Sequence, residues 1–335
     1  MIDELSDGVA ELPTPPRVVA LSGGVGGAKL ALGLAHALAG PELMVVVNTA
    51  DDFRHLGLHV SPDIDTLLYT LAELNNLDTG WGQRDETWSC MDALAKLCPQ
   101  SSWFNLGDRD LATHLVRTAQ LEQGMSLGRV TRELAAAFNV SVQVVPMCDQ
   151  PVATRVQVEL DARQVWLPFQ EYFVKLKTEP AVAAVDYVGA EFASVPAGVR
   201  AALTSDALEA VVICPSNPYL SIDPILAVSG MSHSISDVRV PVVAVSPLVA
   251  GRAIKGPTAK MMAEMGLRPD ARGIAEHYRG IIDGLVLDSA DRAEQPGIEA
   301  LGIEVTVTNT IMNSLQDRIT LAKDVLRFAE TLSNA

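Results

Sequence analysis

Short apolar runs, separated by polar or glycine-containing segments, recur along the chain and determine its predicted architecture. Seven of these runs are rich in Val and Ile and end in small or polar residues, which is typical of strands buried in a parallel sheet. The predicted strands are Val18–Leu21, Leu43–Val47, Ser141–Val145, Val211–Cys214, Val242–Val245, Gly284–Leu287 and Val305–Val307. Helical patterns lie between most of them, at Lys29–Ala39, Ser126–Phe138, Thr258–Met265, Gly273–Tyr278 and Ser314–Leu332. Strands that alternate with helices predict an α/β fold with a doubly wound, mainly parallel sheet.

Two segments depart from this alternation. Residues 63–138 show little strand pattern and predict several helices, at Thr66–Leu74, Glu86–Leu97 and Asp110–Leu121. We expect an inserted helical subdomain there, within a single domain that spans residues 17–335. Alternating apolar and polar positions between Val152 and Val188 predict an antiparallel excursion. Residues 1–16 are acidic and contain prolines, and we expect them to form a disordered tail.

Composition limits the possible binding partners of the protein and the cellular compartment in which it is expected to work. The 335 residues are 48% apolar, which suffices for one large core, and the formal net charge is −16. Such an acidic chain is unsuited to gripping long nucleic acid, and no apolar run approaches the length of a membrane span. The four cysteines, Cys90, Cys98, Cys148 and Cys214, lie far apart without metal-ligand spacing, as in a reducing cytoplasm. We therefore expect a cytoplasmic protein with no nucleic-acid or membrane partner.

Glycines dominate the segment Ser22-Gly23-Gly24-Val25-Gly26-Gly27, which joins the first predicted strand to a helix. Free N–H groups and the helix dipole at such a junction attract phosphate, so Gly23, Gly24, Gly26 and Gly27 are candidate ligand-binding residues. The segment matches neither a P-loop nor a dinucleotide fingerprint, because Lys29 stands where the fingerprint has its last glycine. A packing role for the glycines remains the alternative interpretation.

Aspartates follow the second predicted strand in two pairs. Asp51 and Asp52 come directly after it, and Asp63 and Asp65 follow in Ser61-Pro62-Asp63-Ile64-Asp65-Thr66. Carboxylates beside a phosphate site would repel the ligand unless a divalent cation lies between them, and Mg²⁺ favours carboxylate and phosphate oxygens. Asp51 and Asp65 are the preferred metal and catalytic pair, with Asp63 nearby. Helix capping and turn formation are the alternative roles.

Three further polar groups are candidates for ligand contact. The segment Asn105-Leu106-Gly107-Asp108-Arg109-Asp110 is followed by Thr113-His114, and a helix cap with a local ion pair explains it equally well. Ser216 and Asn217 follow a predicted strand in Pro215-Ser216-Asn217-Pro218. Lys255 lies in a turn with Arg252, which forms either a phosphate clamp or a solvated basic loop. The histidines show no metal-ligand spacing.

In this order, the clusters resemble one family, the 2-phospho-L-lactate transferases that build the deazaflavin coenzyme F-420. The resemblance covers about residues 17–332. It is carried by the glycine segment and by these motifs: Val47-Asn48-Thr49-Ala50-Asp51-Asp52, Ser61–Thr66, Trp81-Gly82, Leu106–His114, Phe169-Gln170-Glu171, Pro215–Pro218 and the Ser246–Lys260 segment. Each motif is weak alone, and the ordered set is specific.

The resemblance implies a Rossmann-like core with a helical subdomain, a Mg²⁺ ion and a homodimer. It also implies two substrates: a three-carbon acid activated as its GDP derivative, and Fo, the 8-hydroxy-5-deazaflavin. The ribityl hydroxyl of Fo attacks the β-phosphorus, GMP leaves, and coenzyme F-420-0 or its dehydro or glyceryl analogue forms. By motif position, Ser216 and Asn217 reach the guanosine and Asn105 to Asp108 flank Fo.

The sequence leaves the donor acid and two other functions open. Phospholactate, phosphoenolpyruvate and phosphoglycerate are all donors within the family, and Trp81–Trp88 with Trp103-Phe104 resembles the bacterial phosphoenolpyruvate members. An NAD-dependent oxidoreductase is one alternative, with Asp51 at the ribose. A non-catalytic nucleotide-sensing regulatory protein is the other.

Overall fold

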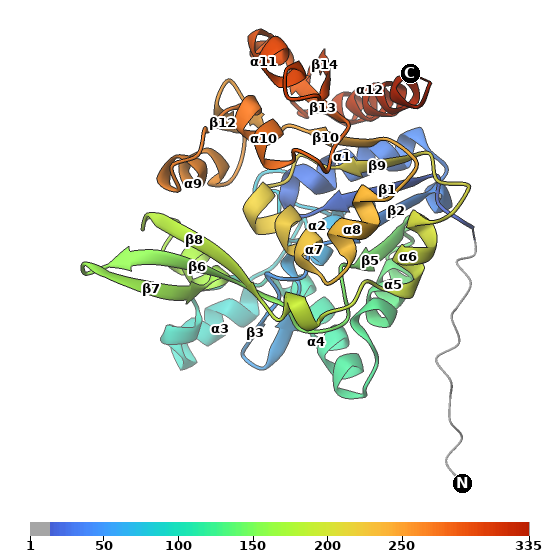
Figure 1. Cartoon of the computed structure of the whole chain (residues 1–335). Helices are drawn as coiled ribbons and strands as arrows, with labels where there is room; N and C mark the ends of the chain where they lie inside the picture. The colour runs from blue at the N-terminus through green and yellow to red at the C-terminus, as the bar shows by residue number, and fades with distance from the viewer. Residues whose placement is uncertain (1–13, 335) are drawn as a thin grey trace.

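A seven-stranded parallel sheet organises the chain, in the order β14-β13-β10-β9-β1-β2-β5 (Figure 1). Its strands are β1 (Val18–Ser22), β2 (Leu43–Val47), β5 (Gln143–Pro146), β9 (Ala210–Ile213), β10 (Val242–Val245), β13 (Gly284–Asp288) and β14 (Glu304–Thr308). Every neighbouring pair is parallel. The seven predicted strands and the predicted doubly wound fold are confirmed.

The computed structural model describes residues 14–334. The expected disordered tail, residues 1–16, falls largely outside these residues. None of the helices in the described range is both long and apolar enough to cross a membrane.

Side chains alternate between the two faces of the sheet and build two apolar layers. Val18 and Ala20 of β1 face a layer formed with α1 (Gly24–Ala37), α2 (Pro62–Leu71), α5 (Leu127–Ala137) and α12 (Leu315–Ser333). Val19 and Leu21 face the opposite layer. That layer contains the helices α6 (Ala197–Leu203), α7 (Asp223–Ala227), α8 (Met231–Ser236), α9 (Thr258–Glu264), α10 (Ala271–His277) and α11 (Gln295–Glu299). Burial on both faces explains why these strands read as continuous apolar runs.

The strand order reverses between β1 and β9. The chain proceeds from β1 to β2 and β5 on one side, and from β9 to β10, β13 and β14 on the other. In open α/β sheets such a reversal opens a crevice at the carboxyl ends of the strands, where ligands bind. The segments that follow β1, β2, β9 and β10 therefore meet at one edge of the sheet.

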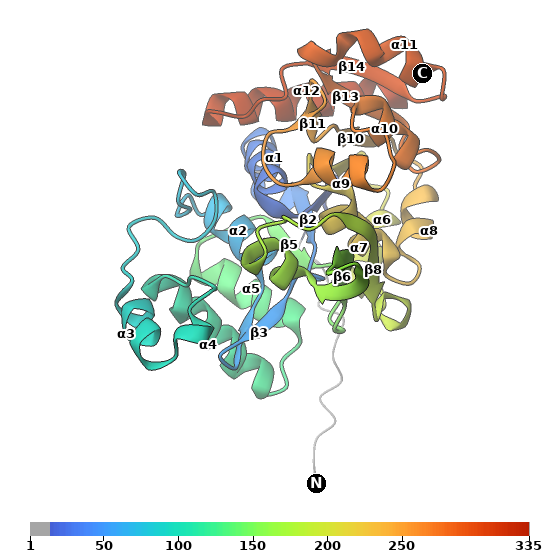
Figure 2. The ribbon, with the colours of Figure 1, turned by 90° about the vertical axis from the view of Figure 1, so that its left-hand side faces the viewer.

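Helices occupy most of residues 62–137. In addition to α2 and α5, which pack on the sheet, this region contains α3 (Ser89–Leu97) and α4 (Asp108–Glu122). A hairpin of β3 (Phe53–His55) and β4 (Leu58–Val60) precedes them and was not predicted. Both views place α3, α4 and β3 at the end of the molecule away from β13 and β14 (Figure 2).

A separate three-stranded antiparallel sheet confirms the predicted excursion. It consists of β6 (Ala153–Leu160), β7 (Arg163–Pro168) and β8 (Val182–Val188), in the order β7-β6-β8. It projects at the left of Figure 1. The Val182 amide donates to Glu264 Oε2 at 3.0 Å, which ties β8 to the end of α9. The last strand pair is the short β11 (Leu248–Val249) and β12 (Arg252–Ala253).

Candidate functional site

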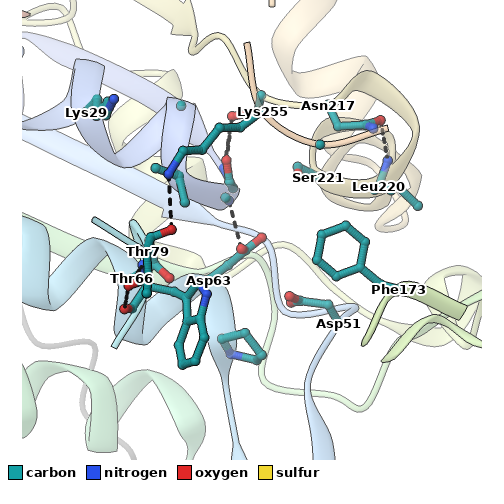
Figure 3. Close-up of a pocket in the computed structure, with 18 of the residues that line it drawn as sticks. Lys29, Asp51, Asp63, Thr66, Thr79, Phe173, Asn217, Leu220, Ser221 and Lys255 are labelled. Carbon is teal, nitrogen blue, oxygen red and sulfur yellow. Dashed lines mark hydrogen bonds between the residues drawn. The ribbon is translucent and has the colours of Figure 1, made fainter. Parts of the chain in front are cut away.

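A cavity of about 680 Å³ opens where the segments after β1, β2, β9 and β10 converge (Figure 3). Its wall combines the beginning of α1, buried carboxylates, aromatic rings and two lysines. The sequence-predicted site residues that line it are Gly23, Gly24, Gly26, Asp51, Asp63, Asp65, Asn105, Ser216, Asn217 and Lys255. Gly27, Gly107, Asp108 and Arg109 lie outside this wall.

The glycine segment is the first turn of a helix. Helix α1 begins at Gly24, earlier than the predicted Lys29. Gly24 has a φ of +63°, which favours glycine, and a Cβ on Gly26 would collide with the Pro215 carbonyl oxygen after β9. Gly27 packs between the hydroxyls of Ser22 and Ser216. The glycines thus bring α1 close to the β9 loop, and the same packing exposes the start of the helix to the cavity.

Two carboxylates of the cavity, Asp51 and Asp63, accept hydrogen bonds from the same side-chain amide, that of Asn48. Asn48 Nδ2 donates to Asp51 Oδ1 at 3.2 Å and to Asp63 Oδ2 at 2.9 Å. The other oxygen of Asp63 accepts the first helical N–H of α1, from Gly24, at 2.7 Å (Figure 3). Asp63 therefore lies directly at the positive end of the α1 dipole.

Burial dominates the electrostatics of this pair, and neighbouring carboxylates add to its effect. Burial, and then the neighbouring charges of Asp63 and Asp52, raise the pKa of Asp51 well above its ordinary value. Burial raises the pKa of Asp63 to about 6, although the Asn48 and Gly24 hydrogen bonds oppose the shift. A divalent cation held by the carboxylates of Asp51 and Asp63 would offset this negative charge, so the donor set fits a hard cation such as Mg²⁺.

Asp65 has a different environment. Its carboxylate is paired with Arg117, whose Nη1 lies 3.0 Å from Asp65 Oδ2 and whose Nη2 contacts Asp65 Oδ1. The Arg117 side chain is fully buried. Of the expected metal pair, Asp51 thus lies beside Asp63, and Asp65 has a guanidinium as its principal partner.

A second acid–base group adjoins Asp65. One ligand atom each of Asp65, Asp110 and His114 lie within 4.8 Å of one another, a geometry compatible with a metal ion. Arg117 Nη1 donates to His114 Nδ1 at 3.2 Å, which places the ring proton of a neutral His114 on Nε2. That nitrogen then has no lone pair for a metal. The Asp110–His114 spacing of four residues on one helix was the sequence signal that could have indicated this group.

The cluster around Asp108 forms helix caps. Asp108 accepts from Thr87 Oγ1 at 2.6 Å and from the Cys90 amide at 3.1 Å at the start of α3. Glu86 accepts from the Arg109 amide at 2.8 Å at the start of α4. Arg109 Nη1 donates to the Arg84 carbonyl at 3.1 Å. Gly107 lies against Glu86, where a Cβ would collide with the carboxylate.

The remaining predicted residues combine structural bonds with exposure to the cavity. Ser216 Oγ donates to the Gly23 carbonyl at 2.7 Å. Asn217 Oδ1 accepts from the Tyr219 amide at 3.0 Å. Lys255 Nζ donates to the Thr79 carbonyl at 3.0 Å across the cavity (Figure 3).

Aromatic side chains form part of the wall and were absent from the predicted site residues. They are Tyr69, Trp81, Trp103, Phe104, Phe169 and Phe173. Phe169 and Phe173 lie with ring centroids 5.2 Å apart, and Trp103 and Phe104 with centroids 5.6 Å apart. Such surfaces suit a flat conjugated ligand, since aromatic rings stack favourably. The signal was present in the Trp81-Gly82, Trp103-Phe104 and Phe169-Gln170-Glu171 motifs.

Fold and site together define a doubly wound α/β protein with a ligand cavity at its topological switch point. The family model described as 2-phospho-L-lactate transferase CofD matches residues 18–311, and the chain belongs to this transferase family. The chain is 39% identical over 315 residues to a phosphoenolpyruvate transferase of Streptomyces griseus, covering 94% of this chain and 98% of the relative. It is 38% identical over 309 residues to a 2-phospho-L-lactate transferase of Methanococcoides burtonii, and the match covers 92% of this chain and 98% of that relative.

The fold also has a counterpart among solved structures. A member of the UPF0052 family from Bacillus halodurans superposes with a TM-score of 0.59 at 14% identity. The match covers 93% of this chain and 99% of the other. At that identity the likeness concerns the fold alone.

Proposed function

We propose that this chain is a Mg²⁺-dependent transferase of coenzyme F-420 biosynthesis. It moves a phosphorylated three-carbon acid from its GDP-activated form to the ribityl hydroxyl of Fo, releases GMP and forms coenzyme F-420-0 or its dehydro or glyceryl analogue. The family membership and the names of the relatives support this proposal. We propose further that it works as a cytoplasmic homodimer, as the resemblance to the family implies.

One observation carries the proposal: a single cavity combines the start of α1, closely spaced buried carboxylates and aromatic walls. The start of α1 suits the diphosphate of a nucleotide, because the helix dipole and the first helical N–H groups favour anions. The diphosphate would take the place of the Asp63 carboxylate on the Gly24 N–H. The aromatic rings suit the deazaflavin ring system. A volume of about 680 Å³ is large enough for sizeable ligands.

Phosphoryl transfer requires positioning and charge neutralisation rather than a protein nucleophile. The Fo hydroxyl oxygen forms a bond to the β-phosphorus while the bond to the bridging oxygen of GMP breaks. The hydroxyl proton passes to a carboxylate of the cavity, for which Asp51 and Asp65 are the candidates. Gly24 and Gly26 lie at the phosphate end, and Asn217 is the candidate for guanosine contact.

The carboxylates Asp51 and Asp63 would hold Mg²⁺, with Asp65 as the third candidate. Bound there, the ion would neutralise phosphate charge. A pair of variants separates the candidates, since Asp51→Asn removes a carboxylate beside Asp63 and Asp65→Asn removes one paired to Arg117. We expect loss of Mg²⁺-dependent stabilisation in Asp51→Asn. If only Asp65→Asn loses it, the metal role belongs to Asp65.

The deciding experiment offers the protein Fo with all three GDP-activated acids and Mg²⁺, and follows the products by mass spectrometry. The expected result is GMP together with one phosphodiester-linked Fo product, which also identifies the donor. The absence of every such product would overturn the proposal. Thermal shifts with GDP, NAD and Fo, each with and without Mg²⁺, then distinguish a transferase from an NAD-dependent oxidoreductase.

A further inference from the structure

Lys29 is an unusual residue for its position. Helix α1 is otherwise built from Gly, Ala, Leu, Val and one His, and it is packed against the sheet. Lysine is seldom buried without a partner, because its ammonium group is costly to remove from water. Here the side chain is half-buried and lines the cavity.

The ammonium group of Lys29 retains hydrogen-bonding capacity. Lys29 Nζ donates to the Met312 carbonyl at 3.2 Å, the one acceptor that residues 14–334 provide for it. A lysine has three donors, so two remain for a ligand. The carbonyl is neutral and leaves the positive charge uncompensated.

Further positive charge gathers at the same end of the cavity. Burial, and then the charges of Arg318 and Lys255, lower the pKa of Lys29. In the close-up, the amine ends of Lys29 and Lys255 lie on one side of the site, and Asp51 lies on the other (Figure 3). The two lysines thus lie together on one side of the cavity, with Asp63 between them and Asp51.

We propose that Lys29 binds an anionic group of the activated donor, either its diphosphate or the carboxylate of the three-carbon acid. The inference rests on the proposed function for the identity of that donor. An anion near Lys29 and Lys255 supplies the compensation that residues 14–334 do not provide for Lys29, and a partly buried ammonium forms strong charge-assisted hydrogen bonds. The Met312 carbonyl holds the side chain against the cavity wall until the anion arrives.

The test compares GDP binding by the full chain and by three variants, using calorimetry with Mg²⁺ present. Lys29→Met keeps the apolar stem, Lys29→Arg keeps the charge, and Lys260→Met is the matched control. Lys260 also donates to a carbonyl, that of Pro180 at 3.1 Å, but it pairs with Glu264 at 2.6 Å and lies outside the wall of the main cavity. Losing a charge-assisted contact weakens GDP or donor binding by about 10- to 100-fold in Lys29→Met. Lys29→Arg and Lys260→Met bind within a few-fold of the parent.

A second titration with the GDP-activated acid separates the two anionic groups. Equal losses for GDP and the activated acid assign Lys29 to the diphosphate, whereas a loss for the activated acid alone assigns it to the carboxylate. Unchanged affinity of Lys29→Met for both ligands overturns the inference. The proposed function fails separately, if the parent chain binds GDP but yields no product with Fo.

Discussion

The pairing of Asp65 with Arg117 shows how one buried contact can decide a residue's role. The two residues are 52 positions apart, and nothing local to Asp65 indicates its partner. Sequence analysis grouped Asp65 with the other aspartates because they share a short stretch. The fold separates them, since helix α4 brings a guanidinium to Asp65 while Asn48 links Asp51 to Asp63.

Replacing Arg117 by Met is predicted to destabilise the chain strongly. Removing one partner of a buried ion pair leaves an uncompensated charge, which costs about 3–5 kcal/mol. The free energy of unfolding from denaturant titration measures the effect. Arg129→Met is the control, because the Arg129–Glu133 pair is exposed and such pairs contribute at most about 1 kcal/mol. Equal losses in the two variants would contradict this account of Arg117.

The raised pKa of Asp63 predicts that the stability of the fold changes with pH in the opposite direction to that expected for an ordinary capping aspartate. Its folded pKa of about 6 exceeds the ordinary 3.8, so the folded state binds the proton more tightly and loses stability as pH rises from about 4 to 6. Asp63→Asn removes this loss. Without divalent cations, the free energy of unfolding of the variant rises relative to that of the parent by up to about 3 kcal/mol between pH 4 and 7.

Asp108 provides the control for this titration. The Thr87 hydroxyl and backbone amides lower the pKa of Asp108, so its carboxylate stabilises the folded state above about pH 4. Asp108→Asn therefore loses stability relative to the parent only as pH rises toward about 4, and its deficit stays nearly constant from pH 4 to 7, where the Asp63→Asn curve changes. Parallel pH curves for the two variants would contradict the environment described for Asp63.

At the scale of elements, helix α1 shows that a glycine-rich segment can be the first turn of a helix rather than a loop before it. The sequence predicted a loop followed by a helix at Lys29, because glycines are poor helix formers. The helix instead begins at Gly24, since contact with the β9 loop outweighs that local preference. The strands of the main sheet were easier to predict, because strands buried on both faces consist of continuous apolar residues. The hairpin β3–β4 has three residues per strand, too few for a clear alternation.

Gly26→Ala is predicted to destabilise the chain by about 1–3 kcal/mol, a typical cost of overpacking. The new Cβ would meet the Pro215 carbonyl and push α1 away from the β9 loop. The same displacement weakens GDP binding, which calorimetry measures. Gly297→Ala is the control in α11, where the nearest atoms to a new Cβ are 3.7 Å away. A fully stable Gly26→Ala variant with unchanged GDP affinity would show that the close contact is unimportant.

At the scale of the molecule, the prediction from sequence succeeded for the architecture and only in part for the site. The sequence predicted that the segments after the strands meet at one edge of the sheet, and Gly24, Asp51 and Ser216 from three of these segments line one cavity. Residues that act through helix caps, such as Asp108, could not be told from ligand contacts. The partners in these caps, Thr87 and Glu86, lie in the loop before α3, about 20 residues earlier in the chain. Aromatic wall residues come from four separate segments that only the tertiary fold assembles.

The site is also expected to lower the stability of the whole chain. Asp51 is buried beside Asp63, so Asp51→Asn relieves repulsion and raises the melting temperature in the presence of a chelator. Added Mg²⁺ stabilises the parent and leaves the melting temperature of Asp51→Asn unchanged. Differential scanning calorimetry with and without MgCl₂ tests both statements. An Asp51→Asn variant that melts below the chelated parent would contradict them.

The contact between Gly24 and Asp63 has one more consequence. The chain supplies its own anion to the end of α1, so a phosphate that arrives there exchanges with a resident carboxylate rather than entering a vacant site. A cation that draws Asp63 toward itself frees the Gly24 amide for the newcomer. Nucleotide and metal affinities are then thermodynamically linked, and each ligand must strengthen the other by the same factor.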